Sequence, residues 1–331
     1  MTFAGILAAA FLALSPPAAV TAAVPGIEQL ETYHADDTSY QAFIEKWSQQ
    51  DQRATFMRDN SERDWSELKR AGALRAQTFV YRADGLRIKG FVVRQAAAGE
   101  AAPILIWAGG GVGRVRLYPP EFVQMASWAR RGYIVIASGY RGSEGSEGSD
   151  EFAGRDVNDL HALSAIARQM FGPRREFAIG FSRGGLMLHK AIAEGLPTAA
   201  YATIGSPTEL KSLAANRKDL AERFREMMPD FEQERRTGYC RRSPVCWPER
   251  IGAPIFIVHG GGDGSIEPAQ SWILTKRLEE VAKPYRLLVI SQADHGLSGH
   301  KADAYERIHS FFVENSATRP RPAGHIKITA H

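Results

Sequence analysis

The sequence predicts an α/β fold in which a mostly parallel sheet carries helices on both faces. Short apolar runs recur along the chain without alternating polar residues, which is typical of strands buried on both faces of a parallel sheet. Segments with helical spacing of apolar residues separate these runs, so strands and helices alternate. With 331 residues and 44% hydrophobic side chains, the chain is large enough for one such domain and additional segments.

The predicted strands begin with a hairpin, in which residues 78–81 and 86–93 flank the turn Ala83-Asp84-Gly85. Single strands are then predicted at 104–107, 134–137, 176–179, 200–204, 255–258 and 286–290. The main helices are predicted at 120–131, 156–170, 184–194, 268–282 and 302–315.

The main α/β domain is predicted to span residues 77–315, with a shorter segment on either side. Residues 24–76 are predicted to form a small helical leader, because apolar residues such as Phe43 and Trp47 fall at helical spacing. Residues 316–331 contain prolines and little apolar periodicity, so we expect a flexible tail.

An insertion at about residues 208–250 interrupts the predicted alternation of strands and helices. The stretch between Ile204 and Ile255 is longer than one helical crossover needs. Within it, Leu213, Leu220 and Phe224 recur at near-helical intervals among charged residues. We therefore expect a helical cap over the carboxyl edge of the sheet.

The first 23 residues differ in composition from the rest of the chain. They carry no charged side chain, and an apolar run at 3–14 is followed by small residues at 20–23. This pattern predicts a secretory signal peptide and an exported protein, because the run is too short to span a bilayer. An uncleaved membrane anchor and a misassigned start are the alternatives.

The charge pattern does not favour a nucleic-acid-binding protein. The formal net charge is +4 and charged residues make up 24% of the chain. Basic residues are spread along the sequence, whereas a nucleic-acid site needs a dense basic surface and a supporting motif. No nucleic-acid partner is predicted.

Cys240 and Cys246 are the only two cysteines. In an exported chain, two cysteines this close predict a disulfide that closes a small loop. Two free thiols are the alternative. A zinc site is not predicted, because no second cysteine pair or spaced histidine pair accompanies them.

A candidate nucleophile lies in Gly180-Phe181-Ser182-Arg183-Gly184, a G-x-S-x-G motif between a predicted strand and a predicted helix. A serine on such a sharp turn is exposed above the sheet, with glycines that let the backbone pass close by. The short motif is weak by itself, so its interpretation depends on the residues that would activate the serine.

A serine hydroxyl needs a base to accept its proton and an acid to orient that base. Asp263 follows the predicted strand at 255–258, and His295 follows the last predicted strand. Both therefore lie at the carboxyl edge of the sheet, in the order expected after Ser182. Asp263 could instead cap the following helix. His259, His300 and Asp294 are weaker candidates for these roles.

The oxyanion of the tetrahedral intermediate needs two backbone N–H donors. Arg183, the residue after the serine, is predicted to supply one. The second is expected from Gly110, in the glycine run that follows the strand at 104–107. A phosphate-binding loop is the alternative for these glycines, but the run lacks the lysine of the P-loop motif.

Over residues 78–315, the chain resembles the catalytic domain of the prolyl oligopeptidase (S9) group of serine peptidases, within the α/β hydrolases. The resemblance rests on Asp84-Gly85, Ile88-Lys89-Gly90, the glycines at 109–111, Tyr140-Arg141-Gly142-Ser143, Asp156-Val157-Asn158-Asp159, the serine motif at 180–185, Arg242-Ser243-Pro244, His259-Gly260 with Asp263, and Asp294-His295-Gly296. It implies that Ser182, Asp263 and His295 are nucleophile, acid and base, and that Gly110 and Arg183 form the oxyanion hole.

Three features depart from the family pattern. Only about fifty residues lie between the predicted signal peptide and the first predicted strand, which is too few for the β-propeller that often gates these peptidases. Ala108 replaces the histidine usual before the glycines, and the segment 208–240 is long and charged.

The resemblance implies a peptidase that acts on small peptides, without a metal or an organic cofactor. The missing propeller favours an esterase that acts on small esters, and an inactive hydrolase-like binding protein is a further alternative.

Overall fold

The computed structural model describes residues 26–33, 39–49, 52–69, 72–111, 119–143, 145–229 and 231–316. The predicted signal peptide and all but the first residue of the predicted tail lie outside these ranges. Within the described part of the chain, no helix is both long and apolar enough to span a membrane.

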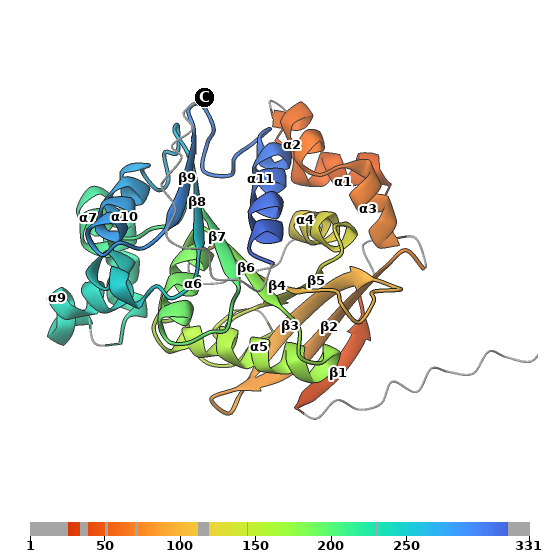
Figure 1. Ribbon diagram of the computed structural model, residues 1–331, viewed down its shortest axis with the longest axis horizontal. Coiled ribbons are helices and arrows are strands. Elements are labelled where there is room, and N and C mark those ends of the chain that lie inside the picture. The colour runs from red at the N-terminus through yellow and green to blue at the C-terminus, as the bar shows by residue number, and fades with distance from the viewer. Residues whose placement is uncertain are drawn as a thin grey trace, which may run out of the picture.

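The sheet has nine strands in the order β1-β2-β3-β5-β4-β6-β7-β8-β9. The first four strands of this order pair antiparallel, and the others pair parallel. The strands are β1 (Ile27–Thr32), β2 (Leu74–Ala83), β3 (Leu86–Gln95), β4 (Ile104–Ala108), β5 (Ile134–Ser138), β6 (Glu176–Phe181), β7 (Ala200–Ile204), β8 (Ile255–Gly260) and β9 (Tyr285–Ile290). This mostly parallel α/β-hydrolase sheet confirms the predicted fold class (Figure 1).

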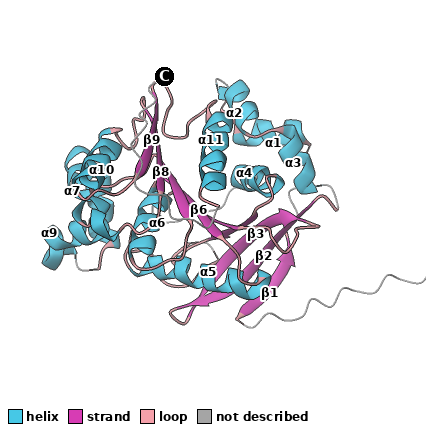
Figure 2. Cartoon of the chain, in the orientation of Figure 1, coloured by secondary structure: helices cyan, strands magenta, loops and turns pink. Residues whose placement is uncertain are grey.

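Alternate residues of each central strand enter two separate cores. In β4, Ile104 and Ile106 join one core, while Leu105 and Trp107 join the other. The first core is covered by α5 (Asn158–Phe171), α6 (Arg183–Ala193) and α10 (Ala269–Glu280), and the second by α4 (Pro119–Arg130) and α11 (Lys301–Glu314). Figure 2 shows helices on both sides of the strands. This burial on both faces explains why the central strands are continuously apolar.

The leader is not wholly helical, which corrects the prediction for residues 24–76. It contains α1 (Tyr40–Trp47), α2 (Arg53–Asp59) and α3 (Glu62–Lys69), but it begins with the strand β1. β1 pairs antiparallel with β2, and Glu28 of β1 lies 3.0 Å from both Arg82 and Arg87. The apolar residues of β1 are three apart, as in a helix, but pairing with the exposed edge of β2 prevails over this local pattern.

The insertion contains the helices α7 (Leu210–Asn216), α8 (Lys218–Met227) and α9 (Phe231–Arg242), followed by the short turns η3 (Pro244–Cys246) and η4 (Pro248–Arg250). A disulfide joins Cys240 to Cys246, with Cα atoms 5.6 Å apart. The ring of Phe224 packs 4.7 Å from that of Phe152, in the loop after β5. The insertion therefore contacts the carboxyl side of the sheet.

Candidate active site

Ser182 occupies a sharp turn between β6 and α6. Its backbone has φ 52° and ψ −123°, a conformation that is strained for a residue with a Cβ. The Ser182 amide donates to the carbonyl of Ile204 at the end of β7, 2.8 Å away, and the Gly185 amide donates to the Ser182 carbonyl. These bonds hold the strained turn, as expected for a nucleophile presented above the sheet.

Position 184 of the serine motif packs so closely against the end of β4 that only glycine fits there. A Cβ on Gly184 would lie 1.9 Å from the carbonyl oxygen of Ala108, at the end of β4. The first turn of α6 therefore abuts the loop after β4. In the sheet, β4 lies between β5 and β6, so the strand order changes direction at β4. Such topological switch points form crevices at the carboxyl edge of a parallel sheet.

Asp263 lies in the loop after β8, and its side chain is fully buried. Its Oδ1 accepts hydrogen bonds from the amides of Ser265 (2.8 Å) and Ile266 (2.9 Å). Its Oδ2 lies 2.7 Å from Nδ1 of His295 and 3.2 Å from Nε2 of His259. Burial raises the pKa of Asp263, but these hydrogen bonds prevail and hold the pKa well below its usual value.

His295 lies in the loop after β9 and is partly exposed, with 23% of its side chain accessible. Because Asp263 is an ionised acceptor, its bond to Nδ1 assigns a proton to that nitrogen. The imidazole ring also packs against Phe181, the residue before the serine, with ring centroids 4.9 Å apart. Asp263 and His295 are thus joined, and His295 lies beside the serine turn.

Gly205 lies between the serine turn and the pair formed by Asp263 and His295. It follows Ile204, whose carbonyl accepts the Ser182 amide. A Cβ on Gly205 would lie 3.0 Å from Nδ1 of His295 and 3.2 Å from Oδ2 of Asp263. Among the described residues, no hydrogen bond joins the Ser182 hydroxyl to His295. The three predicted residues gather at one edge, with only the acid and the base in direct contact.

The two predicted oxyanion residues flank Ser182. A Cβ on Gly110 would lie 3.2 Å from Cβ of Ser182. Arg183 is the first residue of α6, so its amide belongs to the helix turn whose N–H groups have no acceptor within the helix. Both backbones therefore lie close to Ser182.

The side chain of Arg183 has a second role that the sequence analysis missed. It is 1% exposed, and its guanidinium lies 2.5 Å from Asp150 and 2.6 Å from Asp156. The rings of Tyr140 and Phe152 lie 5.1 and 5.7 Å from it. The residue after the serine therefore ties the serine turn to the loop between β5 and α5.

Asp150 differs from Asp263 in acid strength. Burial raises its pKa to about 6, although Arg183 opposes the shift, and the like charge of Asp156 adds to it. Asp150 also accepts a hydrogen bond from the amide of Phe152, 2.9 Å away. Arg183, Asp150 and Asp156 form what we call the arginine cluster.

His259 is a second partner of Asp263. Its side chain is fully buried, and its Nε2 lies 2.8 Å from the carbonyl of Ile266 and 3.2 Å from Oδ2 of Asp263. Both neighbours are acceptors, so Nε2 carries the proton, and Nδ1 accepts from the Ser271 hydroxyl 2.6 Å away. From its position in the sequence, His259 is predicted only as a weaker alternative to His295.

The other competitors have structural partners. Asp294 accepts a hydrogen bond from the Ser298 amide at 2.8 Å, within its own turn. His300 occupies the N-cap position of α11. Neither contacts Asp263 or Ser182 through a hydrogen bond in the described part of the chain.

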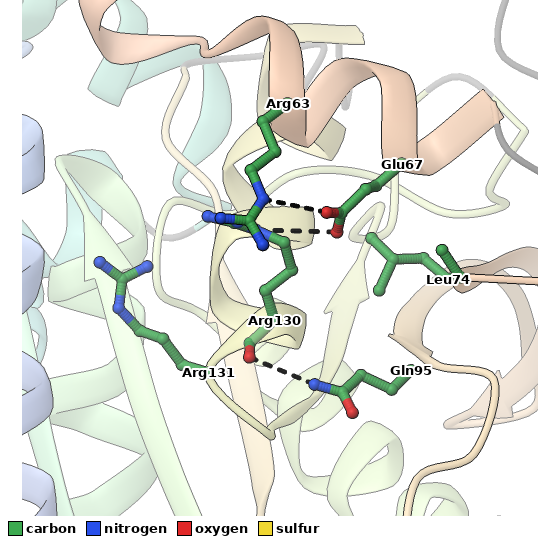
Figure 3. Close-up of a pocket in the computed structure, with 7 residues that line it drawn as sticks. Arg63, Glu67, Leu74, Gln95, Arg130 and Arg131 are labelled. Carbon is green, nitrogen blue, oxygen red and sulfur yellow. Dashed lines mark hydrogen bonds and ion pairs between the residues drawn. The ribbon is translucent and has the colours of Figure 1, made fainter.

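A cavity of about 310 Å³ lies elsewhere, beside α3 and α4 (Figure 3). It is lined by Arg63, Glu67, Ala73, Leu74, Gln95, Arg130 and Arg131. Arg130 lies 2.6 Å from Asp64 and 3.8 Å from Glu67, and Arg63 lies 3.1 Å from Glu67. The cavity has basic groups already paired with carboxylates, and none of the candidate site residues lines it.

Comparisons with known proteins agree with the fold. A model of the prolyl oligopeptidase family matches residues 120–319. The uncharacterized peptidase YtmA of Bacillus subtilis (strain 168) is 30% identical over 227 residues, covering 67% of this chain and 86% of that protein.

Two solved structures share the fold. The acylaminoacyl peptidase of Pyrococcus horikoshii is 20% identical, with a TM-score of 0.63, over 73% of this chain and 42% of its own. A puromycin-hydrolyzing peptidase of Mycobacterium tuberculosis is 24% identical, with a TM-score of 0.61, over 77% of this chain and 42% of its own. The matched region thus spans less than half of each solved chain.

Proposed function

Since this chain belongs to the prolyl oligopeptidase family, we propose that it is a serine peptidase whose nucleophile, base and acid are Ser182, His295 and Asp263. The observation that carries the proposal is the 2.7 Å contact between Nδ1 of His295 and Oδ2 of Asp263, beside a serine in a strained turn. Strained, positive-φ serines and buried carboxylate–imidazole pairs each have structural explanations. Their meeting at one edge of the sheet favours acyl transfer.

In the proposed reaction, Asp263 holds the proton of His295 on Nδ1, which leaves Nε2 to accept the proton of the Ser182 hydroxyl. The serine oxygen attacks the substrate carbonyl, and the N–H groups of Gly110 and Arg183 stabilise the oxyanion. His295 then gives its proton to the leaving amine as the C–N bond breaks. Water, deprotonated by the same imidazole, releases the acyl group and restores the serine.

The proposed substrates are small peptides or aminoacyl amides. YtmA, which covers two thirds of this chain at 30% identity, is named as a peptidase, and this favours peptide substrates. A small ester is the alternative substrate, because the same nucleophile and oxyanion donors would attack an ester carbonyl.

Export is part of the proposal. The uncharged apolar start of the chain and the disulfide between Cys240 and Cys246 both favour an oxidising compartment outside the cytoplasm. N-terminal sequencing of the protein recovered from cell fractions tests this. A start near residue 24 in the exported fraction is expected, and an intact Met1 found only in the cytoplasm would contradict it.

The activity is tested by comparing peptidyl anilides with p-nitrophenyl esters as substrates of the wild type and of Ser182→Ala. We expect the wild type to cleave the anilides, and the variant to lose roughly 10⁶-fold in kcat with its far-UV circular dichroism unchanged. Ester cleavage without anilide cleavage would replace the peptidase by an esterase. Full activity of the variant would remove Ser182 from the reaction.

A further inference from the structure

The leader touches the turn that carries His295. The C-terminal end of α2 packs against the start of α11, and Figure 1 shows the two helices side by side. The Gly299 amide donates to Asp59, at 3.0 Å from Oδ2 and 3.2 Å from Oδ1. Arg58 donates to the Gly299 carbonyl at 3.4 Å. Two successive residues of the leader thus bind the backbone N–H and C=O of Gly299, only four residues after His295.

Asp59 binds the start of α11, which has no side-chain cap of its own. The N-cap residue of α11, His300, makes no capping hydrogen bond with its own side chain. The carboxylate of Asp59 instead accepts from the Gly299 amide, just before the helix, and lies 3.7 Å from Nζ of Lys301 in its first turn. A carboxylate also interacts favourably with the positive end of a helix dipole. Asp59 therefore holds the start of α11 from 240 residues away in sequence.

The segment from Asp294 to His300 is a compact turn that can transmit this restraint. The amide of Ser298 donates to the Asp294 side chain at 2.8 Å, and the Leu297 amide donates to the Asp294 carbonyl at 3.1 Å. The His300 amide donates to the Leu297 carbonyl at 2.8 Å, and Leu297 is fully buried. Because hydrogen bonds cross the turn, fixing Gly299 also limits the positions open to His295.

We propose that Asp59 is a positioning residue, which holds the turn 294–300 so that His295 stays bonded to Asp263 and directed at Ser182. The inference rests on the proposed role of His295. It assigns to the leader a part in the reaction, although α2 lies outside the residues that match the family model.

The environment of Asp59 supports a specific role. Its side chain is 4% exposed, and burial raises its pKa although Lys301 and the backbone hydrogen bonds oppose the shift. Burying a carboxylate is costly unless its hydrogen bonds are satisfied. The hydrogen bonds that satisfy Asp59 come from Gly299, in the turn 294–300 that carries His295.

The test compares Asp59→Ala and Asp59→Asn with the control Asp303→Ala. Asp303 is also an acid in the first turn of α11, but it is exposed and pairs with Arg307 at 2.9 Å. Active sites are counted by titration with a fluorophosphonate, so that kcat is expressed per competent site and unfolded protein does not count.

For Asp59→Ala we expect kcat per site to fall roughly 10- to 100-fold, the loss typical of a small displacement of a catalytic group, with KM little changed. Asp59→Asn keeps an acceptor for the Gly299 amide and should lose less. The control should match the wild type. If Asp59→Ala and Asp59→Asn both keep the kcat of the control, the positioning role is refuted.

Hydrogen exchange separates this inference from the proposed function. We expect the amides of residues 294–300 to exchange faster in Asp59→Ala and Asp59→Asn than in Asp303→Ala. Unchanged exchange would refute the restraint even if Ser182 proves to be the nucleophile. If Ser182→Ala keeps its activity, Asp59 has no positioning role in catalysis. Faster exchange in the Asp59 variants would still show that Asp59 holds the turn 294–300.

Discussion

Two buried aspartates on either side of the serine turn have opposite acid strengths. Asp263, on the side of His295, has a pKa held well below its usual value. Asp150, on the side of the arginine cluster, has a pKa raised to about 6. Both side chains are at most 5% exposed, so burial alone does not distinguish them.

The difference lies in the groups around each carboxylate. Asp263 has two backbone amides and two imidazole N–H groups directed at its oxygens, and no acidic group is among the main influences on its pKa. Asp150 shares Arg183 with Asp156, and the like charge favours the protonated form. Directed donors thus lower the pKa of Asp263, whereas Asp150 shares one cation with a second acid and its pKa is raised.

Among changes to the two aspartates and their partners, the largest effect on activity is expected from Asp263→Asn. The amide group that replaces the carboxylate would present N–H to Nδ1 of His295, which moves the imidazole proton to Nε2, where the serine proton must go. We expect kcat to fall by roughly 10⁴-fold. Steady-state kinetics with a peptidyl anilide measure this, and a fall of less than tenfold would contradict the role of Asp263.

The largest effect on stability is expected from Arg183→Met, which leaves Asp150 and Asp156 buried without their cation. The free energy of unfolding should fall by about 3–5 kcal/mol, the usual result of removing one partner of a buried pair. Urea unfolding measures this. The triple variant that adds Asp150→Asn and Asp156→Asn should recover part of the loss, and no recovery would show that the carboxylates are not its cause.

The pH dependence of stability should also separate the two aspartates. The folded pKa of Asp150 is raised from 3.8 to about 6, so its contribution to stability is present below pH 4 and is lost as the pH rises through 6. The folded pKa of Asp263 is lowered, so its contribution is present above pH 4 and is lost on acidification.

The variant Asp150→Asn tests the pH dependence of stability that is predicted for Asp150. Between pH 4 and 7, the free energy of unfolding of the wild type should fall relative to the variant, by up to about 3 kcal/mol. Urea unfolding across this range measures the difference. Wild-type stability that rises relative to the variant would mean that Asp150 is an ordinary ionised partner of Arg183.

A smaller effect is expected from His259→Phe, which removes one donor from Asp263 while keeping a ring in the core. Loss of one hydrogen bond to a charged group should lower kcat/KM by about 10- to 100-fold, equivalent to 1.5–3 kcal/mol. His259→Gln offers a donor again and should recover part of the loss. Equal activity of the two variants would show that the Nε2 donor does not matter.

The sequence predicted the fold and the gathering of the candidate site, because both follow from strand order. Ser182, Asp263 and His295 each follow a buried strand, and parallel strands end at one edge of the sheet. The strand β1 was missed because its apolar spacing is helical and only pairing with β2 makes it extended.

The supporting residues could not be predicted in the same way. Arg183 was predicted for its amide, but its side-chain partners lie 27 and 33 residues away in a loop without periodicity. Asp59 and Gly299 are 240 residues apart, and neither belongs to a recognisable motif. His259 was named, but one sequence does not distinguish a buried histidine from one that binds the catalytic acid.

The most direct test of the account is the reaction of the wild type with a fluorophosphonate, followed by peptide mapping, beside Asp263→Asn and His295→Ala. We predict one covalent adduct per chain, on Ser182 alone, and labelling at least about 100-fold slower in both variants. An adduct on another residue, or labelling of Ser182 at the same rate in all three proteins, would contradict the assignment of Ser182, His295 and Asp263 as one catalytic unit.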